Sequence, residues 1–106
     1  MNREVRRLIR DYLALVRRDG IRVQEVRLFG SRARGKGRRW SDIDLCIVSP
    51  QFGKDYRSEG MRLRGIAAGL RVTYPIEPIP FHPKDLQDKY DTLASEIRKY
   101  GKKIRV

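Results

Sequence analysis

The sequence predicts a single α/β (α+β) domain over residues 1–106, in which a mixed β-sheet carries helices on one face. Three observations predict it. Apolar residues recur at helical spacing near both ends of the chain, two short β-branched and apolar runs follow the first helix, and a third apolar run contains three prolines. No repeat, low-complexity tract or interdomain linker divides the 106 residues, a length typical of one domain.

The first expected element is a helix between Asn2, which suits an N-cap, and Gly20, which suits a helix stop. Arginines cover much of its surface, so the helix should show a basic face to solvent. Its apolar stripe consists of Val5, Leu8, Ile9, Tyr12, Leu13 and Val16.

Two strands are expected next, over residues 23–29 and 43–48. Gly30 ends the first strand, and Ser49-Pro50 ends the second. Residues 31–39 are rich in glycine and basic side chains, which predicts a short helical turn followed by a loop.

The second half of the chain is less regular. Residues 50–60 predict a mobile loop and residues 61–70 a short helix, although two glycines weaken it. The prolines of residues 74–81 place a strand there at a sheet edge. Residues 83–100 predict one helix, and residues 102–106 predict a last short strand. The apolar stripe of this last helix would be Leu86, Tyr90, Leu93 and Ile97.

The net charge of +12 is concentrated in the first part of the chain. Residues 1–39 hold thirteen basic and four acidic side chains. Such a field attracts nucleotides, nucleic acid or acidic protein surfaces. Solubility or an arginine-rich thermophile composition would also account for the excess, so charge alone does not identify a partner.

Features of a membrane or secreted protein are not expected. No apolar run approaches the roughly 20 residues that span a bilayer, and charges interrupt the N-terminal region where a signal peptide would lie. Cys46 is the single cysteine, so an internal disulfide is excluded and a cytoplasmic location is expected. Its side chain should fill buried space on the face that Asp44 shares.

Two carboxylates form the centre of the predicted site. Asp42 and Asp44 are separated by one residue, so on a strand they point to the same face, about 7 Å apart. Like charges at that spacing repel unless a cation lies between them. Carboxylate oxygens suit Mg²⁺ or Mn²⁺, and a pair of such ions can activate an attacking oxygen and stabilise a leaving pyrophosphate.

The glycine turn supplies phosphate-binding groups beside these acids. Gly30 lets the backbone approach a phosphate, and Ser31 offers a hydroxyl and an N–H at an apparent helix start. Arg32 and Arg34 can add charge-assisted bonds to phosphate oxygens. Each motif alone is common, as a solvated strand end or an ordinary turn, but their combination at this spacing predicts a nucleotide site.

Glu77 is the candidate for a third ligand. It is the only acid in residues 74–81, and it would face the same cavity as Asp44 if that strand lies beside residues 43–48. It would then bind one metal ion and serve as general base for the attacking hydroxyl. The alternative is an exposed glutamate on an edge strand.

Gly30-Ser31, a ten-residue spacer, Asp42-Ile43-Asp44 and the later acid Glu77 resemble the motif of the DNA polymerase β-type nucleotidyltransferase superfamily. Residues 29–35 and 41–45 resemble its small prokaryotic members, the minimal nucleotidyltransferases, over nearly the whole chain. The third acid departs from the family pattern, in which Asp is more frequent. As a second departure, these 106 residues are not expected to include a C-terminal helical domain that would hold an acceptor.

The resemblance implies Mg²⁺-dependent transfer of a nucleoside monophosphate, AMP from ATP, to a hydroxyl. It also implies an antitoxin that acts on a HEPN-domain partner and modifies one of its tyrosines. Three alternatives stay open: an antitoxin that neutralises its partner by contact alone, a transferase acting on nucleic acid, and one acting on a small-molecule hydroxyl. The preferred nucleotide, the acceptor and any homo-oligomer are left undetermined.

Overall fold

The computed structural model describes residues 1–35, 41–70 and 74–105. The predicted N-terminal helix is confirmed as α1 (Arg3–Arg18), and the Asn2 side chain accepts a hydrogen bond from the Val5 N–H, as an N-cap should. Its stripe of apolar residues is buried in the core, apart from Leu8, which is half-buried. The Tyr12 hydroxyl at the centre of the stripe donates to the Leu63 carbonyl at 2.9 Å and so ties α1 to α2.

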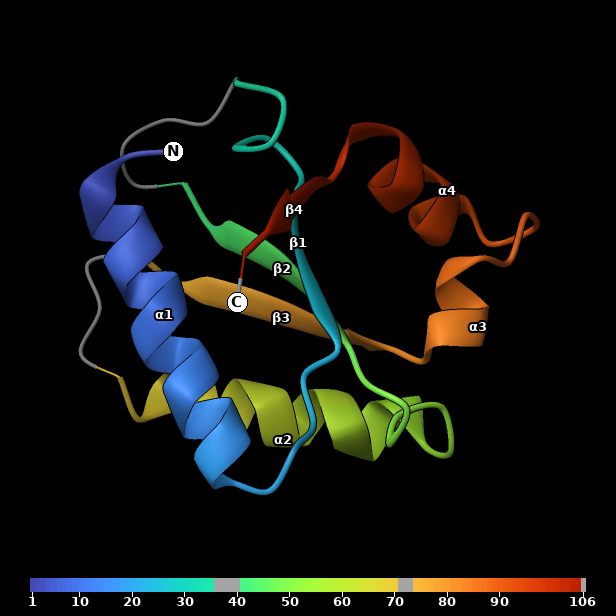
Figure 1. Ribbon diagram of the computed structural model, residues 1–106, viewed down its shortest axis with the longest axis horizontal. Coiled ribbons are helices and arrows are strands. Elements are labelled where there is room, and N and C mark those ends of the chain that lie inside the picture. Colours follow the sequence, from blue (N-terminus) through green and yellow to red (C-terminus); the bar gives the residue numbers. More distant parts are fainter. Residues whose placement is uncertain (36–40, 71–73, 106) are drawn as a thin grey trace.

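Four strands form a mixed sheet in the order β3-β2-β1-β4 (Figure 1). The strands are β1 (Glu25–Phe29), β2 (Ile43–Val48), β3 (Ile76–Phe81) and β4 (Lys102–Ile104). β1 is antiparallel to both β2 and β4, whereas β2 and β3 are parallel. The expected edge position of the proline-bearing strand and its place beside residues 43–48 are therefore confirmed.

Helices cover both faces of the sheet, which corrects the expectation of helices on one face only. α1 and α2 (Tyr56–Ala68) pack on the face that carries Ile43, Leu45 and Ile47. α3 (Pro83–Leu86) and α4 (Thr92–Tyr100) pack on the opposite face, against Cys46 and Val48. Side chains alternate along β2, with Ile43, Leu45 and Ile47 on one face and Cys46 and Val48 following Asp44 on the other. Both faces therefore carry apolar side chains that need a cover. Figure 1 shows the two pairs of helices on opposite sides of the strands.

The helix α2 begins at Tyr56, within the segment expected to be a mobile loop. The Asp55 side chain caps it by accepting from the Ser58 N–H at 3.3 Å. The Glu59 carboxylate accepts from the backbone N–H groups of residues 53–55 and folds the preceding loop onto the helix. These local bonds extend the helix across Gly60 toward its beginning.

The single helix expected over residues 83–100 is in fact two helices. Asp91 caps α4 through the Ala94 N–H at 3.0 Å, and His82 caps α3 through the Lys84 N–H at 3.0 Å. Tyr90, expected on the buried stripe, lies between the helices and is 84% exposed. Gly101 ends α4 as expected, and the short last strand is confirmed as β4. Among the helices that the structure describes, none is long and apolar enough to cross a membrane.

Candidate active site

The residues of the predicted site meet at one edge of the sheet, where β1 ends and both β2 and β3 begin. Phe29, the last residue of β1, pairs with Asp44, and Asp44 in turn pairs with Glu77 across the parallel β2–β3 ladder. Gly30 follows β1 directly, and Asp42 immediately precedes β2. The chain thus brings the glycine turn and the three acids together.

Asp44 is the electrostatic centre of this edge. Its carboxyl group is half-buried, and this burial raises its pKa, with further increases from the negative charges of Asp42, Glu77 and Glu96. Within residues 1–35, 41–70 and 74–105, Asp42, Asp44 and Glu77 make no ion pair, whereas Glu96 pairs with an arginine. The edge therefore has a deficit of positive charge that a bound cation would correct.

Gly30 is in direct contact with the Asp44 carboxylate. Its φ is +73°, in the left-handed region, and a Cβ at this position would lie 2.2 Å from Asp44 Oδ2. A side chain is therefore excluded twice, by backbone conformation and by space. The close approach fixes the glycine turn against the acid that is expected to bind metal.

Arg32 holds the chain just before Asp42. Its guanidinium donates from Nε and Nη2 to the Ser41 carbonyl, at 3.0 and 2.8 Å, and lies 4.9 Å from the centre of the Tyr74 ring. These contacts connect the turn to the start of β2 across nine residues. Arg32 therefore positions the acidic edge, a role that sequence analysis did not foresee beside its proposed phosphate binding.

Arg34 points to α4. Its Nη2 lies 3.5 Å from Glu96 Oε1, and its guanidinium carbon lies 4.0 Å above the Tyr100 ring. Glu96 is a member of the site that sequence analysis missed. No short motif marks it, because its position near Asp44 depends on how α4 packs across the sheet.

Ser31 is exposed and lies at the start of hydrogen-bonded turns. The Arg34 N–H donates to the Gly30 carbonyl oxygen at 3.3 Å, and the Gly35 N–H donates to the Arg32 carbonyl oxygen, also at 3.3 Å. Residues 31–35 form these turns rather than a regular helix, so the expected helix start is reduced to one turn. The rest of the predicted loop lies outside the described residues.

The donor set fits a hard divalent cation, because Asp42, Asp44 and Glu77 offer only carboxylate oxygens. In the part of the chain that the structure describes, no three acidic, histidine or cysteine side chains are placed closely enough to enclose a metal ion. The fit thus rests on ligand chemistry, on the raised pKa of Asp44 and on the close approach of the Gly30 turn to its carboxylate.

This fold and this edge define an α/β protein in which a glycine turn lies beside a cluster of carboxylates. The chain belongs to the nucleotidyltransferase domain family, whose sequence profile matches residues 9–106. The match includes the glycine turn and all three acids. No curated protein sequence matches the chain significantly.

A solved structure described as a toxin-antitoxin crystal structure with AMP-PNP shares the fold. The superposition has a TM-score of 0.61, and the sequences are 24% identical. It covers 92% of this chain and 70% of the other. At this level of identity the similarity establishes the fold and leaves the chemistry to the residues of the site.

Proposed function

We propose that this chain is a Mg²⁺-dependent nucleotidyltransferase that moves AMP from ATP to a tyrosine hydroxyl of a HEPN-domain toxin, and so acts as a cytoplasmic antitoxin. The observation that carries the proposal is the half-buried Asp44 carboxylate, with its raised pKa, against Gly30 and beside two further acids. The family match supports nucleotide transfer. The AMP-PNP and the toxin of the similar structure support the nucleotide and the partner.

Asp42, Asp44 and Glu77 would hold the metal, as two Mg²⁺ ions or with Mn²⁺ as a substitute. When bound, these ions would neutralise the triphosphate and activate the attacking oxygen. Gly30 would let the turn lie against the Asp44 carboxylate, and Ser31 and Arg34 would donate hydrogen bonds to phosphate oxygens. Arg32 would keep Asp42 in place through the Ser41 carbonyl.

In the reaction, the acceptor oxygen forms a bond to the α-phosphorus of ATP, and the bond from that phosphorus to the bridging oxygen of the β-phosphate breaks. Pyrophosphate leaves with that oxygen. The hydroxyl proton passes to Glu77, which lies beside Asp44 in the ladder and is exposed to an incoming acceptor. The products are an AMP-tyrosine phosphodiester and pyrophosphate.

The decisive experiment incubates the protein with Mg²⁺, a candidate HEPN protein and ATP labelled at either the α- or the γ-phosphate. AMP transfer labels the partner from α-labelled ATP only, whereas phosphorylation would label it from γ-labelled ATP. Asp42→Asn should abolish the labelling. Asp11→Asn is the matched control, because Asp11 is an exposed acid on α1, outside the site.

Glu77→Gln separates the base from the other acids. We expect transfer to fall by about two to four orders of magnitude, as is usual for loss of a general base. Unchanged turnover would remove Glu77 from the site. Tight binding of the partner without any transfer would leave neutralisation by contact as the function, and labelling of RNA instead of the partner would favour a nucleic-acid transferase.

A further inference from the structure

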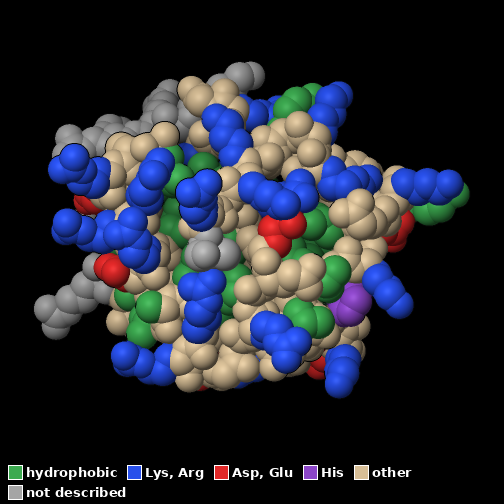
Figure 2. Space-filling view, viewed as in Figure 1, with side chains coloured by type: hydrophobic (Ala, Val, Ile, Leu, Met, Phe, Trp, Pro, Cys, Tyr) green, Lys and Arg blue, Asp and Glu red, His purple; other side chains and the backbone are tan. Residues whose placement is uncertain are grey.

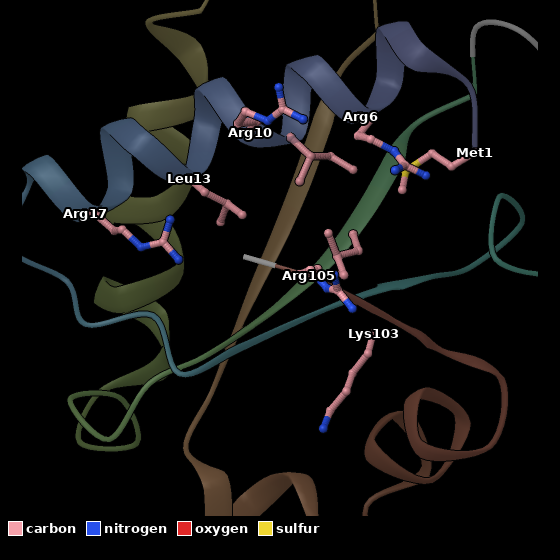
Figure 3. Close-up of a pocket in the computed structure, with 9 residues that line it drawn as sticks. Met1, Arg6, Arg10, Leu13, Arg17, Lys103 and Arg105 are labelled. Carbon is pink, nitrogen blue, oxygen red and sulfur yellow. The ribbon is translucent and has the colours of Figure 1, made fainter.

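A basic groove runs between α1 and β4, away from the acidic edge. It has a volume of about 560 Å³ and is bounded by one stripe of α1 and by residues 103–105. In Figure 3, the arginines of α1 line one side of the groove, and Lys103 and Arg105 lie on the other. We call it the α1–β4 groove.

No acidic side chain among the described residues forms an ion pair with the α1 arginines of this groove. Arg6, Arg10 and Arg17 are four and seven residues apart, so they follow one side of the helix. Throughout residues 1–35, 41–70 and 74–105, none of these three side chains makes an ion pair. Lys103 differs, since it lies 3.4 Å from Glu25. Figure 2 shows Lys and Arg side chains gathered over this face of the molecule.

The floor of the groove is apolar. Met1 and Ile104 supply its accessible apolar surface, whereas Ile9 and Leu13 also line it but are almost completely buried. No aromatic side chain is among the described residues that line the groove. Single-stranded nucleic acids bind through bases that stack on aromatic rings along a basic track. A floor of aliphatic side chains instead suits the aliphatic side chains of a polypeptide.

β4 offers a backbone edge to such a polypeptide. Among the described strands it pairs with β1 alone, so its other edge has no strand beside it. Ile104 pairs with Val26 of β1, and both side chains belong to the core beneath α1. An extended segment laid along β4 would therefore meet the apolar floor and the arginines of α1 at once.

The groove also continues toward the acidic edge. A second hollow of about 330 Å³ shares Met1, Arg6 and Lys103 with it and is lined further along by Arg32 and Gly35 of the glycine turn. Material bound between α1 and β4 would therefore lead to the turn that holds Asp42 and Asp44 in place.

We propose that the α1–β4 groove binds an extended, acidic segment of a partner protein. Its aliphatic side chains would pack on Met1 and Ile104, and its carboxylates would pair with Arg6, Arg10 and Arg17. The proposal does not depend on nucleotide transfer, because none of these residues belongs to the acidic edge. A second copy of this chain is a poor occupant, since two molecules of net charge +12 repel each other.

The test measures fluorescence anisotropy at about 150 mM salt, where long-range attraction is screened. The probe is a fluorescein-labelled eight-residue peptide of alternating Glu and Leu. Comparison probes are the Glu-Ser and Lys-Leu peptides and an eight-nucleotide oligouridylate. We expect the Glu-Leu peptide to bind best, the Glu-Ser peptide several-fold more weakly, and the Lys-Leu peptide not at all. Tighter binding of the oligouridylate, or no binding of the Glu-Leu peptide, would overturn the proposal.

Charge-matched variants locate the site. Arg10→Glu/Arg17→Glu should weaken Glu-Leu binding by at least about tenfold, through loss of two pairs and gain of repulsion. Arg7→Glu/Arg18→Glu makes the same change of charge on α1 outside the groove and should weaken it less than about twofold. Equal losses would show diffuse attraction and refute the groove. Amide shifts in wild-type protein provide a check without mutation, and they should cluster in residues 6–17 and 102–105.

A second copy as occupant would appear in sedimentation experiments. Wild-type protein should sediment as a monomer at the peptide-binding concentrations. A dimer that dissociates in Arg10→Glu/Arg17→Glu and persists in Arg7→Glu/Arg18→Glu would assign the groove to self-association and overturn the proposal.

Discussion

The acidic edge of the sheet and the α1–β4 groove have opposite charge but share one property. At the edge, Asp42, Asp44 and Glu77 lie together without a described cationic partner; in the groove, Arg6, Arg10 and Arg17 lie together without an acidic one. Elsewhere the chain does pair such groups, as in Arg62 with Asp19 at 2.7 Å. Unneutralised charge of either sign lowers the stability of a fold.

Among the described residues, the fold thus keeps a cluster of carboxylates and a cluster of arginines apart without neutralising either. With 25 basic and 13 acidic residues, the chain has enough arginine to neutralise the acidic edge. Instead, Arg32 bonds to a backbone carbonyl there, and Arg34 pairs with Glu96. The edge is thereby left to attract cations, and the groove to attract anions.

The largest effect is expected from Gly30→Ala. The left-handed backbone and the contact with Asp44 Oδ2 should together lower the free energy of unfolding by about 3 kcal/mol and reduce AMP transfer more than about a hundredfold. Urea denaturation and the labelling assay measure these losses.

Gly35→Ala is the control, since its φ is +72° but nothing lies within 4 Å of its Cβ position. It should cost about 1 kcal/mol, from backbone strain alone. Equal losses in the two variants would show that the contact with Asp44 is unimportant.

Asp44→Asn should abolish transfer and yet raise the melting temperature in EDTA at neutral pH. Because the folded state raises the pKa of Asp44 above the usual 3.8, the protonated form is favoured in the fold. The contribution of Asp44 to wild-type stability is therefore fully present below the pKa that Asp44 has in the unfolded chain. It decreases as the pH rises through the higher pKa that Asp44 has in the folded protein. The difference in melting temperature between Asp44→Asn and the wild type should grow as the pH rises through this range. A difference that stays constant or reverses would contradict the prediction.

The same variant tests the metal. Mg²⁺ should raise the melting temperature of the wild type, because it binds the folded state only, and should leave Asp44→Asn unchanged. Asp11→Asn should respond as the wild type does. A Mg²⁺ effect that survives in Asp44→Asn would place the cation elsewhere.

Arg34→Ala should have a smaller effect on stability. Its ion pair with Glu96 and its contact with Tyr100 are both partly exposed, so the unfolding free energy should fall by less than about 1 kcal/mol. If Arg34 also binds phosphate, the free energy of ATP binding, measured by calorimetry, should weaken by more than the free energy of unfolding does. An unchanged affinity would limit Arg34 to holding α4.

The smallest effect is expected from Arg10→Gln, which removes one charge from the groove. Relief of repulsion should raise the unfolding free energy by less than about 0.5 kcal/mol, and the gain should disappear in high salt. Urea denaturation at two salt concentrations measures it. A salt-independent loss of stability would mean that Arg10 has a structural contact and that the charge of the groove is not unneutralised.

The strands and the acidic edge were predictable because their signals are local. Alternation and flanking glycine or proline predicted β2 with its bounds as observed, and the Asp-x-Asp spacing fixed which acids share a face. The position of Glu77 beside Asp44 depended on β3 lying next to β2, which the structure confirms, whereas the sequence did not indicate that the two strands are parallel.

Predictions from the sequence were wrong or incomplete where side-chain capping sets the bounds of a helix or where packing between elements sets a contact. The bonds of Asp55 and Glu59 set the start of α2, and Asp91 interrupts the last helical pattern; neither effect appears in apolar periodicity. Glu96 and the α1–β4 groove depend on how helices lie across the sheet. No spacing within one segment indicates such contacts.

Cys46 gives the protein an internal reporter of unfolding. It is the only cysteine, is fully buried in β2, and burial raises its thiol pKa to about 12. A thiol in this state scarcely reacts with maleimide or disulfide reagents. The rate of its modification should therefore follow the opening of the central strand beneath Asp44, so that one native side chain reports how metal or nucleotide changes that opening.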